Sequence, residues 1–308
     1  TLNTLFENKK KWDESIFVST YSNELIEVYK IISKSRRRLG DIKYFSTDGL
    51  NETNAIRDKI LIRESKYIGD DEHFVLSGPH FYVGIPLYKN PRKNCILRSD
   101  YDVIDLCRID ANFRPRTNYL PANSKKLKII ENINNSTWTK EFRIIFGKML
   151  NQPGERTLQS AIIPPNYSHV NNIISVQVKN TSELLTLCSF TTSLIYDFYI
   201  KITGKNNLYD ETLRLFPIEI NGKYRNALFV RILRLNCVNK FYDPLWEECW
   251  EEEFRNEEWS KDDNRLNIYA NLSKYWNWDT PFRNYYERRL ALIEIDVITA
   301  IALGLKIE

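Results

Sequence analysis

The 308-residue chain has little glycine or proline and no long apolar run. With 10 Gly, 11 Pro and 43% hydrophobic residues, the composition excludes a low-complexity or disordered chain and predicts a globular protein with a sizeable core. The absence of an 18-residue apolar stretch excludes a transmembrane helix. Thr1–Lys11 also lacks the apolar core of a secretory signal. We therefore expect a soluble, cytoplasmic protein.

Cysteine and histidine are also sparse. The three histidines and five cysteines include no CxxC pair, and the cysteines are odd in number and widely spaced. This pattern predicts reduced, mostly buried thiols and argues against a disulfide framework or a zinc site. We accordingly predict no metal site. The cysteines are Cys95, Cys107, Cys188, Cys237 and Cys249.

Methionine occurs once, at Met149, and the chain opens at Thr1. It stops at AIALGLKIE, directly after a predicted helix. From these two features we expect a piece cut from a longer protein.

The net charge of +4 hides an uneven distribution. Residues 1–130 hold 23 basic and 17 acidic residues (+6), residues 131–235 hold 12 and 8 (+4), and residues 236–308 hold 9 and 15 (−6). A basic body with an acidic end is typical of a nucleic-acid binder with one face turned away from the polyanion. The same excess also occurs in proteins that bind no nucleic acid.

The basic residues occur in clusters, and each cluster taken alone is also consistent with an ordinary solvated surface. Pure Lys/Arg runs favour phosphate contact, which needs only charge. In FRPRTNY (Phe113–Tyr119), arginine and asparagine stand beside aromatics, and these side chains can bind base edges. The predicted phosphate-binding residues are Arg36, Arg37, Arg38, Lys125, Lys126 and Lys128.

Periodicity and turn residues predict a mixed α and β chain. Helical spacing covers Glu14–Lys34, Thr181–Lys205 and Tyr285–Gly304. Loop-rich β structure is expected from Asp41 to Asn123, and PPNYSHVNN (Pro164–Asn172) is expected to be a turn-forming loop. Three strands are predicted at Phe142–Phe146, Leu158–Ile163 and Ile173–Val178.

The acidic end combines glutamates with tryptophans. In Leu245–Trp259, residues 246, 250 and 254 lie four apart, which predicts a helix that buries aromatics and exposes glutamates. This arrangement needs no catalytic role. A cation site is disfavoured because the glutamates follow no recognisable loop pattern.

The motifs of common enzymes are missing. The chain contains no GxSxG, Walker A, HExxH or GxGxxG. Ile163–Tyr167 (IPPNY) and Asp243–Trp246 (DPLW) are near misses of the polar–Pro–Pro–aromatic loop that grips a flipped adenine, and Glu219–Lys223 has the wrong spacing for a metal nuclease. We expect no catalytic residues here, and we expect His80 to be a loop or core histidine.

Several strings taken together resemble one family. SGPHF with IPLYKNPRKNC and SDYDVIDL (Ser77–Leu106), PRTNYLP, ERTLQSAIIPP, ALFVRILRLNC with DPLWEE, and YYERRLALIEIDVITAIALGL are similar to the C-terminal part of large adenine-specific DNA methyltransferases. These enzymes belong to restriction-modification and related phage-defence systems. The resemblance spans about residues 70–305.

The resemblance implies a target-recognition region whose catalytic core lies upstream in the parent chain. It implies that the parent uses S-adenosylmethionine, that no cofactor binds this piece, and that its partners are double-stranded DNA and the upstream methyltransferase domain, with no membrane. Base flipping needs the duplex held on both sides of the extruded nucleotide, and a recognition lobe would supply one side. The predicted base or groove residues are Arg92, Lys93, Arg114, Arg116, Asn118, Gln159, Asn166 and Tyr167.

As architecture, we predict α+β: a β-rich, loop-decorated lobe with a long central helix and a helical C-terminal end. Residues 1–45 would be a helical connector from an upstream domain, 46–235 the recognition domain, and 236–308 the acidic, Trp-rich helical region. Two alternatives stay open. One is a module that docks a protein of a defence complex through region 236–308, and the other is a self-contained enzyme such as a nuclease.

Overall fold

The computed structural model describes residues 22–133, 136–220 and 222–305, and its fold is α+β as the sequence predicts. The centre is an antiparallel sheet in the order β1-β12-β9-β10. Its strands are β1 (Tyr44–Thr47), β9 (Arg143–Gly147), β10 (Ser160–Ile163) and β12 (Ile173–Val178). The last three strands confirm the predicted ones within two residues.

The sheet is buried on both faces, because apolar side chains point alternately to opposite sides of a strand. Ile144, Phe146 and Ile162 join the large core beneath the helices. Ile145 and Ile163 join a smaller core on the other face. That second core is completed by residues of β3 (Phe74–Leu76) and β11 (Tyr167–His169), which pair in parallel.

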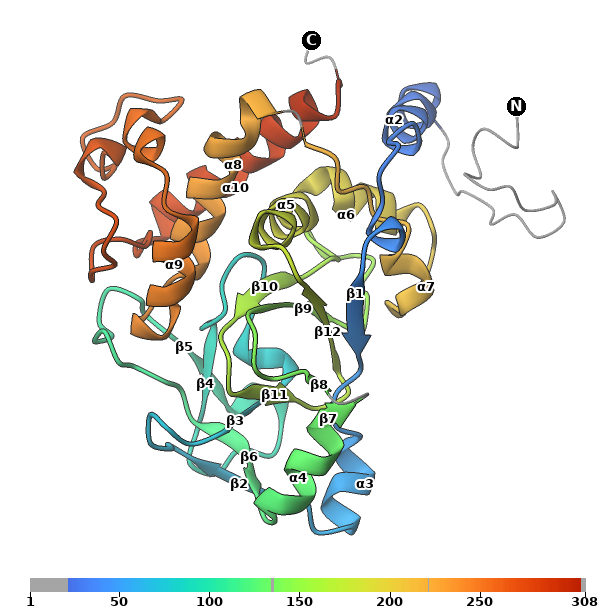
Figure 1. Ribbon diagram of the computed structural model, residues 1–308, viewed down its shortest axis with the longest axis vertical. Helices are drawn as coiled ribbons and strands as arrows, with labels where there is room; N and C mark the ends of the chain where they lie inside the picture. Colours follow the sequence, from blue (N-terminus) through green and yellow to red (C-terminus); the bar gives the residue numbers. More distant parts are fainter. Residues whose placement is uncertain (1–21, 134–135, 221, 306–308) are drawn as a thin grey trace, which may run out of the picture.

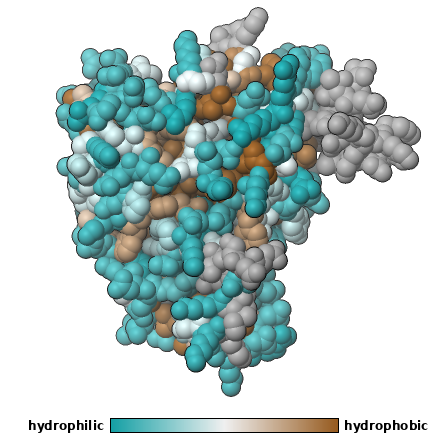
Figure 2. Space-filling view, viewed as in Figure 1, coloured by the Kyte–Doolittle hydropathy of each residue, from teal (hydrophilic) through white to brown (hydrophobic). Residues whose placement is uncertain are grey.

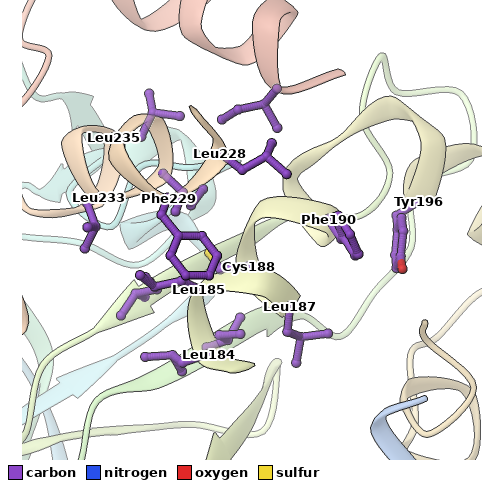
Figure 3. Close-up of a cluster of buried hydrophobic side chains, with 14 of the residues drawn as sticks. Leu184, Leu185, Leu187, Cys188, Phe190, Tyr196, Leu228, Phe229, Leu233 and Leu235 are labelled. Atoms are coloured by element: carbon purple, nitrogen blue, oxygen red, sulfur yellow. The ribbon is translucent and has the colours of Figure 1, made fainter. Parts of the chain in front are cut away.

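Helices cover the first face of the sheet and form the upper half of the molecule (Figure 1). They are α5 (Thr181–Thr192), α6 (Leu194–Lys201), α7 (Asp210–Leu213), α8 (Gly222–Asn236) and α10 (Tyr285–Ala302), with α2 (Asn23–Ser33) near the top. Leu185 and Cys188 of α5 lie against Phe229 of α8 (Figure 3). None of the helices in the described part of the chain is long and apolar enough to cross a bilayer.

The opposite end of the molecule is a lobe of short elements (Figure 1). It contains β2 (Leu61–Lys66) paired antiparallel with β6 (Thr117–Pro121), and β4 (Lys89–Pro91) paired antiparallel with β5 (Tyr101–Val103). The remaining elements are α3 (Glu52–Arg57), α4 (Ser124–Glu131), β7 (Asn132–Ile133) and β8 (Ser136–Thr137). This confirms the loop-rich β structure predicted for residues 41–123.

Two predicted helices are interrupted. The helix expected over Thr181–Lys205 is two helices, because Ser193 is extended (φ −80°, ψ 154°) and its hydroxyl accepts a hydrogen bond from the backbone N–H of Tyr196 at 3.4 Å, which caps the second helix. The helix expected over Leu245–Trp259 is only α9 (Asp243–Cys249), followed at Glu252–Asn256 by a 3-10 helix. Trp250, with ψ 130°, ends α9.

Other predicted elements are present with different first or last residues. The C-terminal helix is confirmed at Tyr285–Ala302. The helix predicted at Glu14–Lys34 is present as α2, and its first residues lie outside the described part of the chain. The loop predicted at Pro164–Asn172 contains the short strand β11. The domain boundaries at 45/46 and 235/236 stay a prediction, and the large core draws residues from both sides of each, such as Ile32 and Phe254.

Candidate nucleic-acid interface

A polar cleft of about 760 Å³ opens in the lower lobe. Its walls come from the end of β2, from β6, from α4 and from the segment 68–73, which precedes β3. Figure 2 shows that hydrophilic residues cover most of this end of the molecule on the side shown. The lining residues are Lys66, Ile68, Asp71, Glu72, His73, Leu120, Pro121, Ser124, Leu127, Lys128, Asn132, Thr139, Lys140 and Asn166.

Three lysines from separate segments reach this cleft. Lys66 ends β2, Lys128 lies on α4 and Lys140 lies between β8 and β9. All three are exposed, and none forms an ion pair with a residue that the structure describes. The acidic residues of the cleft are Asp71 and Glu72, and Glu72 is engaged locally because its Oε2 accepts from the backbone N–H of Gly69 at 2.5 Å.

Arg114 fixes one wall of the cleft from behind. Its guanidinium donates to the carbonyl oxygens of Gly69 (2.7 Å), Asp70 (3.0 Å) and Glu72 (3.1 Å). Its cationic carbon also lies 5.1 Å from the ring centre of Tyr167, one of three aromatic rings around it. The segment 69–72 is therefore held by an internal arginine and not by regular secondary structure.

Asn166 presents its side chain at the rim of the cleft in a left-handed backbone conformation (φ 64°). Its backbone N–H donates to Thr139 O at 2.8 Å, and its carbonyl accepts from the Phe74 N–H at 3.0 Å. Asparagine tolerates this conformation better than most residues. Both backbone bonds hold the exposed amide in place.

Next to Lys66, the ring of Tyr67 packs against the guanidinium of Arg116. The guanidinium of Arg116 lies 4.2 Å from the ring centre of Tyr67, and the Tyr67 hydroxyl accepts from the side chain of Asn90 at 3.0 Å. Asn90 in turn accepts from the Arg116 N–H at 2.8 Å. Tyr67 is about half exposed. These three residues join the cleft to β4.

The β4–β5 hairpin (residues 89–103) continues this surface. Arg92 forms a two-pronged ion pair with Asp102, with Nη2–Oδ1 and Nε–Oδ1 distances of 2.7 and 3.0 Å. The neighbouring Lys93 is exposed and has no ion-pair partner among the described residues. β2 approaches the hairpin through Ser65, whose hydroxyl donates to Arg92 O at 2.7 Å.

Three predicted groove residues lie inside the protein, which corrects their assignment. Arg114 supports the cleft wall as described. Asn118 is buried and donates to the Tyr101 hydroxyl, and Tyr167 is buried with its ring stacked on Phe74 at 4.9 Å. All three side chains are buried and make internal contacts, so each has a structural role here.

The other predicted residues are dispersed. Asn166 lines the cleft, and Arg116 packs on Tyr67 and donates to Pro91 O at 3.2 Å. Lys93 and the ion-paired Arg92 lie on the hairpin, and Gln159 is half-buried before β10. Lys125 and Lys128 are exposed on α4, which also contains Lys126, whose side chain lies outside the described atoms. Lys66, Tyr67 and Lys140 were not predicted from the sequence, because none of them belongs to a basic run.

The cluster Arg36–Arg38 follows the C-terminal end of α2, in the segment that leads down to β1, whereas α4 lies at the bottom of the lower lobe (Figure 1). Arg38 donates to Leu215 O at 2.6 Å and to Ser33 O at 2.9 Å, and Arg37 pairs with Glu183. The Arg36 side chain is exposed. The two predicted phosphate-binding clusters therefore do not form one surface.

The histidines show no catalytic arrangement among the described residues. His80 and His169 are buried, and burial lowers the pKa of both, that of His169 to about 3. His80 bonds Arg116 O at 2.8 Å, which fits the structural role predicted for it. His73 lines the cleft and bonds Ser168 Oγ at 2.8 Å, but Ser168 is fully buried. The described residues contain no cluster of His, Cys, Asp or Glu that could hold a metal ion.

The acidic segment after α8 uses its tryptophans internally. Trp246 is fully buried and donates to Ser273 O at 2.9 Å, and Trp276 donates to Cys237 O at 2.8 Å. Arg231 of α8 holds this segment to α10 through Glu257 (2.9 Å) and Glu294 (2.7 Å). The residues that this region exposes to solvent include Glu252 and Glu253.

Comparison with known proteins places the chain in no family. No family model matches it, and no curated protein matches it. Among solved structures, it is similar to the crystal structure of the type IIG restriction endonuclease BpuSI, with a TM-score of 0.37 and 10% sequence identity. The match covers 91% of this chain and 33% of that one, so the chain spans about a third of its length. A likeness this low does not establish a shared fold.

Proposed function

We propose that this chain binds duplex DNA through its lower lobe. The observation that carries the proposal is the convergence of Lys66, Lys128 and Lys140 on one open cleft without ion-pair partners among the described residues. Unpaired lysines gathered from separate segments create a local positive potential, and phosphate contact needs charge more than exact geometry.

The lysines of the cleft would have a different task from Arg116 and Asn166. The three cleft lysines, with Lys125 on the same helix as Lys128, would neutralise phosphates. Arg116 and Asn166 carry the donors and acceptors that read base edges, and the contacts of Tyr67 and Thr139 with these residues would keep them in place. Phosphate contacts would set the register, and the two groove residues would contribute sequence preference.

The finer proposal concerns the parent enzyme. Together with the family resemblance of the long sequence strings, DNA binding by this lobe supports a target-recognition part of an adenine-specific DNA methyltransferase. Methyl transfer and the S-adenosylmethionine site would belong to another domain of the parent. The role of this chain would be to hold the duplex beside the base that is flipped.

A binding titration with labelled duplex DNA at two salt concentrations tests the proposal. We expect the affinity of the wild-type chain to fall steeply with salt. Replacing Lys128 and Lys140 by Gln should weaken binding about tenfold and reduce the slope of log K against log salt by about 1.8, since each phosphate contact contributes about 0.9.

The matched control removes the same charge elsewhere. Lys179 and Lys274 are exposed and form no ion pair with the described residues. Lys179→Gln with Lys274→Gln should change affinity less than twofold. Equal losses in the two double variants would mean that only net charge matters, and salt-independent or absent binding of the wild type would reject DNA as the partner.

One observation favours a second candidate function, the docking of another protein. The exposed glutamates of α9 and the following 3-10 helix form an acidic surface on a rigid, tryptophan-packed segment. Such a surface fits a basic partner. Its tryptophans, however, are mostly occupied within the fold, so the anchors that usually dominate interfaces would be missing. DNA binding is therefore the preferred proposal.

A further inference from the structure

The tip of the β4–β5 hairpin exposes two consecutive aliphatic side chains. Ile96 is 73% and Leu97 65% exposed, and Ile96 is the most exposed large aliphatic residue in the described part of the chain. Single exposed apolar residues are common on protein surfaces. A consecutive pair at the tip of a hairpin is a different feature and requires an explanation.

The backbone of this tip is held in place. One oxygen of Asp100, Oδ2, accepts from the backbone N–H groups of both Ile96 (2.9 Å) and Leu97 (2.7 Å), and Asp100 N–H donates back to Leu97 O at 3.1 Å. Arg63 of β2 donates to Ile96 O at 2.8 Å. These backbone hydrogen bonds also lower the pKa of Asp100, so the cap stays charged and intact at neutral pH. The exposed pair is thus presented by a fixed backbone.

Positive charge flanks the apolar pair. Lys93 precedes it and Arg98 follows it, and neither forms an ion pair with a described residue. The nearby carboxylates are engaged, since Asp100 caps the tip and Asp102 pairs with Arg92. Arg98 Nη2 lies 3.9 Å from the sulfur of Met149, a third exposed apolar side chain. Two exposed apolar side chains between cations without ion-pair partners are complementary to a polyanion that has an apolar interior.

Duplex DNA has this character, because its phosphates are charged and its stacked bases are apolar. Proteins that kink DNA insert Leu, Ile or Met side chains between base pairs while nearby cations hold the backbone. A rigid tip suits this task, because a fixed wedge loses little conformational freedom on insertion.

We propose that the hairpin tip inserts Ile96 and Leu97 between base pairs of the duplex, with Lys93 and Arg98 on the flanking phosphates. This inference rests on the proposed DNA binding and deepens it, because the wedge would unstack the duplex beside the recognised site. β2 links the two features, because its Lys66 lines the cleft and its Arg63 donates to Ile96 O in the tip.

Insertion unwinds DNA, which can be measured without knowing the recognised sequence. Closed circular plasmid is relaxed by topoisomerase I in the presence of saturating protein, the protein is removed, and the topoisomers are separated on a gel. Binding is measured in parallel by gel shift. We expect the wild-type chain to shift the topoisomer distribution. Ile96→Ser with Leu97→Ser should lose this shift at saturation and bind DNA about tenfold more weakly.

A matched control removes two exposed aliphatic residues from α10. Ile293→Ser with Val297→Ser should leave both the shift and the affinity as in the wild type. Because all four side chains are exposed, the variants should fold normally, which a thermal melt verifies. A wild-type chain that binds plasmid without changing the topoisomers, or a tip variant that shifts them as fully as the wild type, would overturn the wedge and leave DNA binding standing. The latter result would favour a protein contact for the tip.

The cap provides a second, independent variant. Asp100→Ala keeps both aliphatic side chains but frees the tip, so the topoisomer shift at saturating protein should shrink. Asp100→Asn retains an acceptor for the two N–H groups and should restore the shift. No plasmid binding by the wild type would instead reject the proposed function itself, and with it the wedge.

Discussion

At the residue scale, arginines bind backbone carbonyl oxygens at several points of the molecule. Arg288, which is buried, donates to the carbonyls of Phe282, Gly84 and Leu235 at 2.7–2.9 Å. Arg114 does the same for the cleft wall, and Arg38 binds the carbonyls of Ser33 at the end of α2 and of Leu215 after α7. A guanidinium has five donors in a fixed fork, so one side chain can satisfy several carbonyls of irregular segments. Several arginines of this protein therefore stabilise the fold by binding backbone carbonyls.

His169 supplies a pH prediction at the same scale. Its Nε2 bonds Ser175 Oγ at 2.9 Å and its Nδ1 lies 3.2 Å from Val170 O, which suits a neutral ring. Burial and Arg143 lower its pKa from 6.5 to about 3. Because the unfolded state binds the proton more tightly, stability falls as pH drops below 6.5. We expect a loss of about 2 kcal/mol from this residue between pH 7 and pH 5.

Urea unfolding at pH 7 and pH 5 checks this value. The His169→Gln variant lacks the titrating group, so its free energy of unfolding should fall with pH by about 2 kcal/mol less than that of the wild type. An identical pH dependence in the two proteins would show that His169 is not kept neutral in the fold.

Sequence patterns identified the charged residues but did not predict which of their side chains are buried and which are exposed. FRPRTNY predicted exposed base readers, yet Arg114 and Asn118 of this string are buried, while the partly exposed Arg116 packs on Tyr67. The partners that decide between these outcomes, such as Glu72 and Tyr101, are distant in sequence. Lys66 and Lys140 were missed for the same reason, since only folding brings them together.

At the element scale, helices are interrupted where side chains or buried contacts replace helical hydrogen bonds. Ser193 caps α6, and Asp197 of α6 then accepts from the backbone N–H groups of Thr157 (2.5 Å) and Leu158 (2.6 Å) just before β10. The break thus coincides with an anchor for a central strand. Helical periodicity continues through residues 181–205, so the sequence pattern did not predict the helix break at Ser193.

The clamp between α8, α10 and the acidic segment yields an element-scale prediction. Arg231 and Glu294 are both nearly inaccessible to solvent, and Ser260 N–H also donates to Glu294 at 2.6 Å. Arg231→Met would leave a buried carboxylate without its partner, so unfolding free energy should drop by about 3–5 kcal/mol.

The double variant Arg231→Met with Glu294→Leu distinguishes the energy of the ion pair from the packing energy of the two side chains. Removing both charges should recover about 2 kcal/mol or more of the single-variant loss, because the uncompensated charge is gone. Chemical denaturation of the two single variants and the double variant measures this coupling. Strict additivity would argue against a tightly coupled buried pair.

At the scale of the whole molecule, the charge division seen in sequence has a structural counterpart. The cleft and its lysines occupy the lower lobe, while the acidic segment lies in the upper half beside α8 and α10 (Figure 1). The α+β class, the three later strands and the last helix could be predicted, because each depends on local alternation or periodicity. The cleft could not, since it is assembled from non-local segments.

Because the cleft and the acidic segment lie apart, mutations can test DNA binding and protein docking separately. Glu252 and Glu253 are exposed in the acidic segment. Replacing both by Lys should leave the affinity for duplex DNA within about twofold at 0.15 M salt, because screening is strong beyond about 8 Å. The same variant should lose binding to any basic protein partner. A large change in DNA affinity would place the acidic segment at the DNA surface.

The register of the central sheet has a consequence for how such a chain diversifies. Ser175 of β12 pairs with Thr47 of β1 on one side and with Ile145 of β9 on the other, so residues 48–142 leave and re-enter the sheet about 10 Å apart. Parts of this stretch also belong to the framework, because Leu87, Leu106 and Ile109 join the large core and Gly84 O accepts from Arg288. Loop length adds little to the cost of closure, so we expect changes in length to be tolerated only in segments that make no such contact.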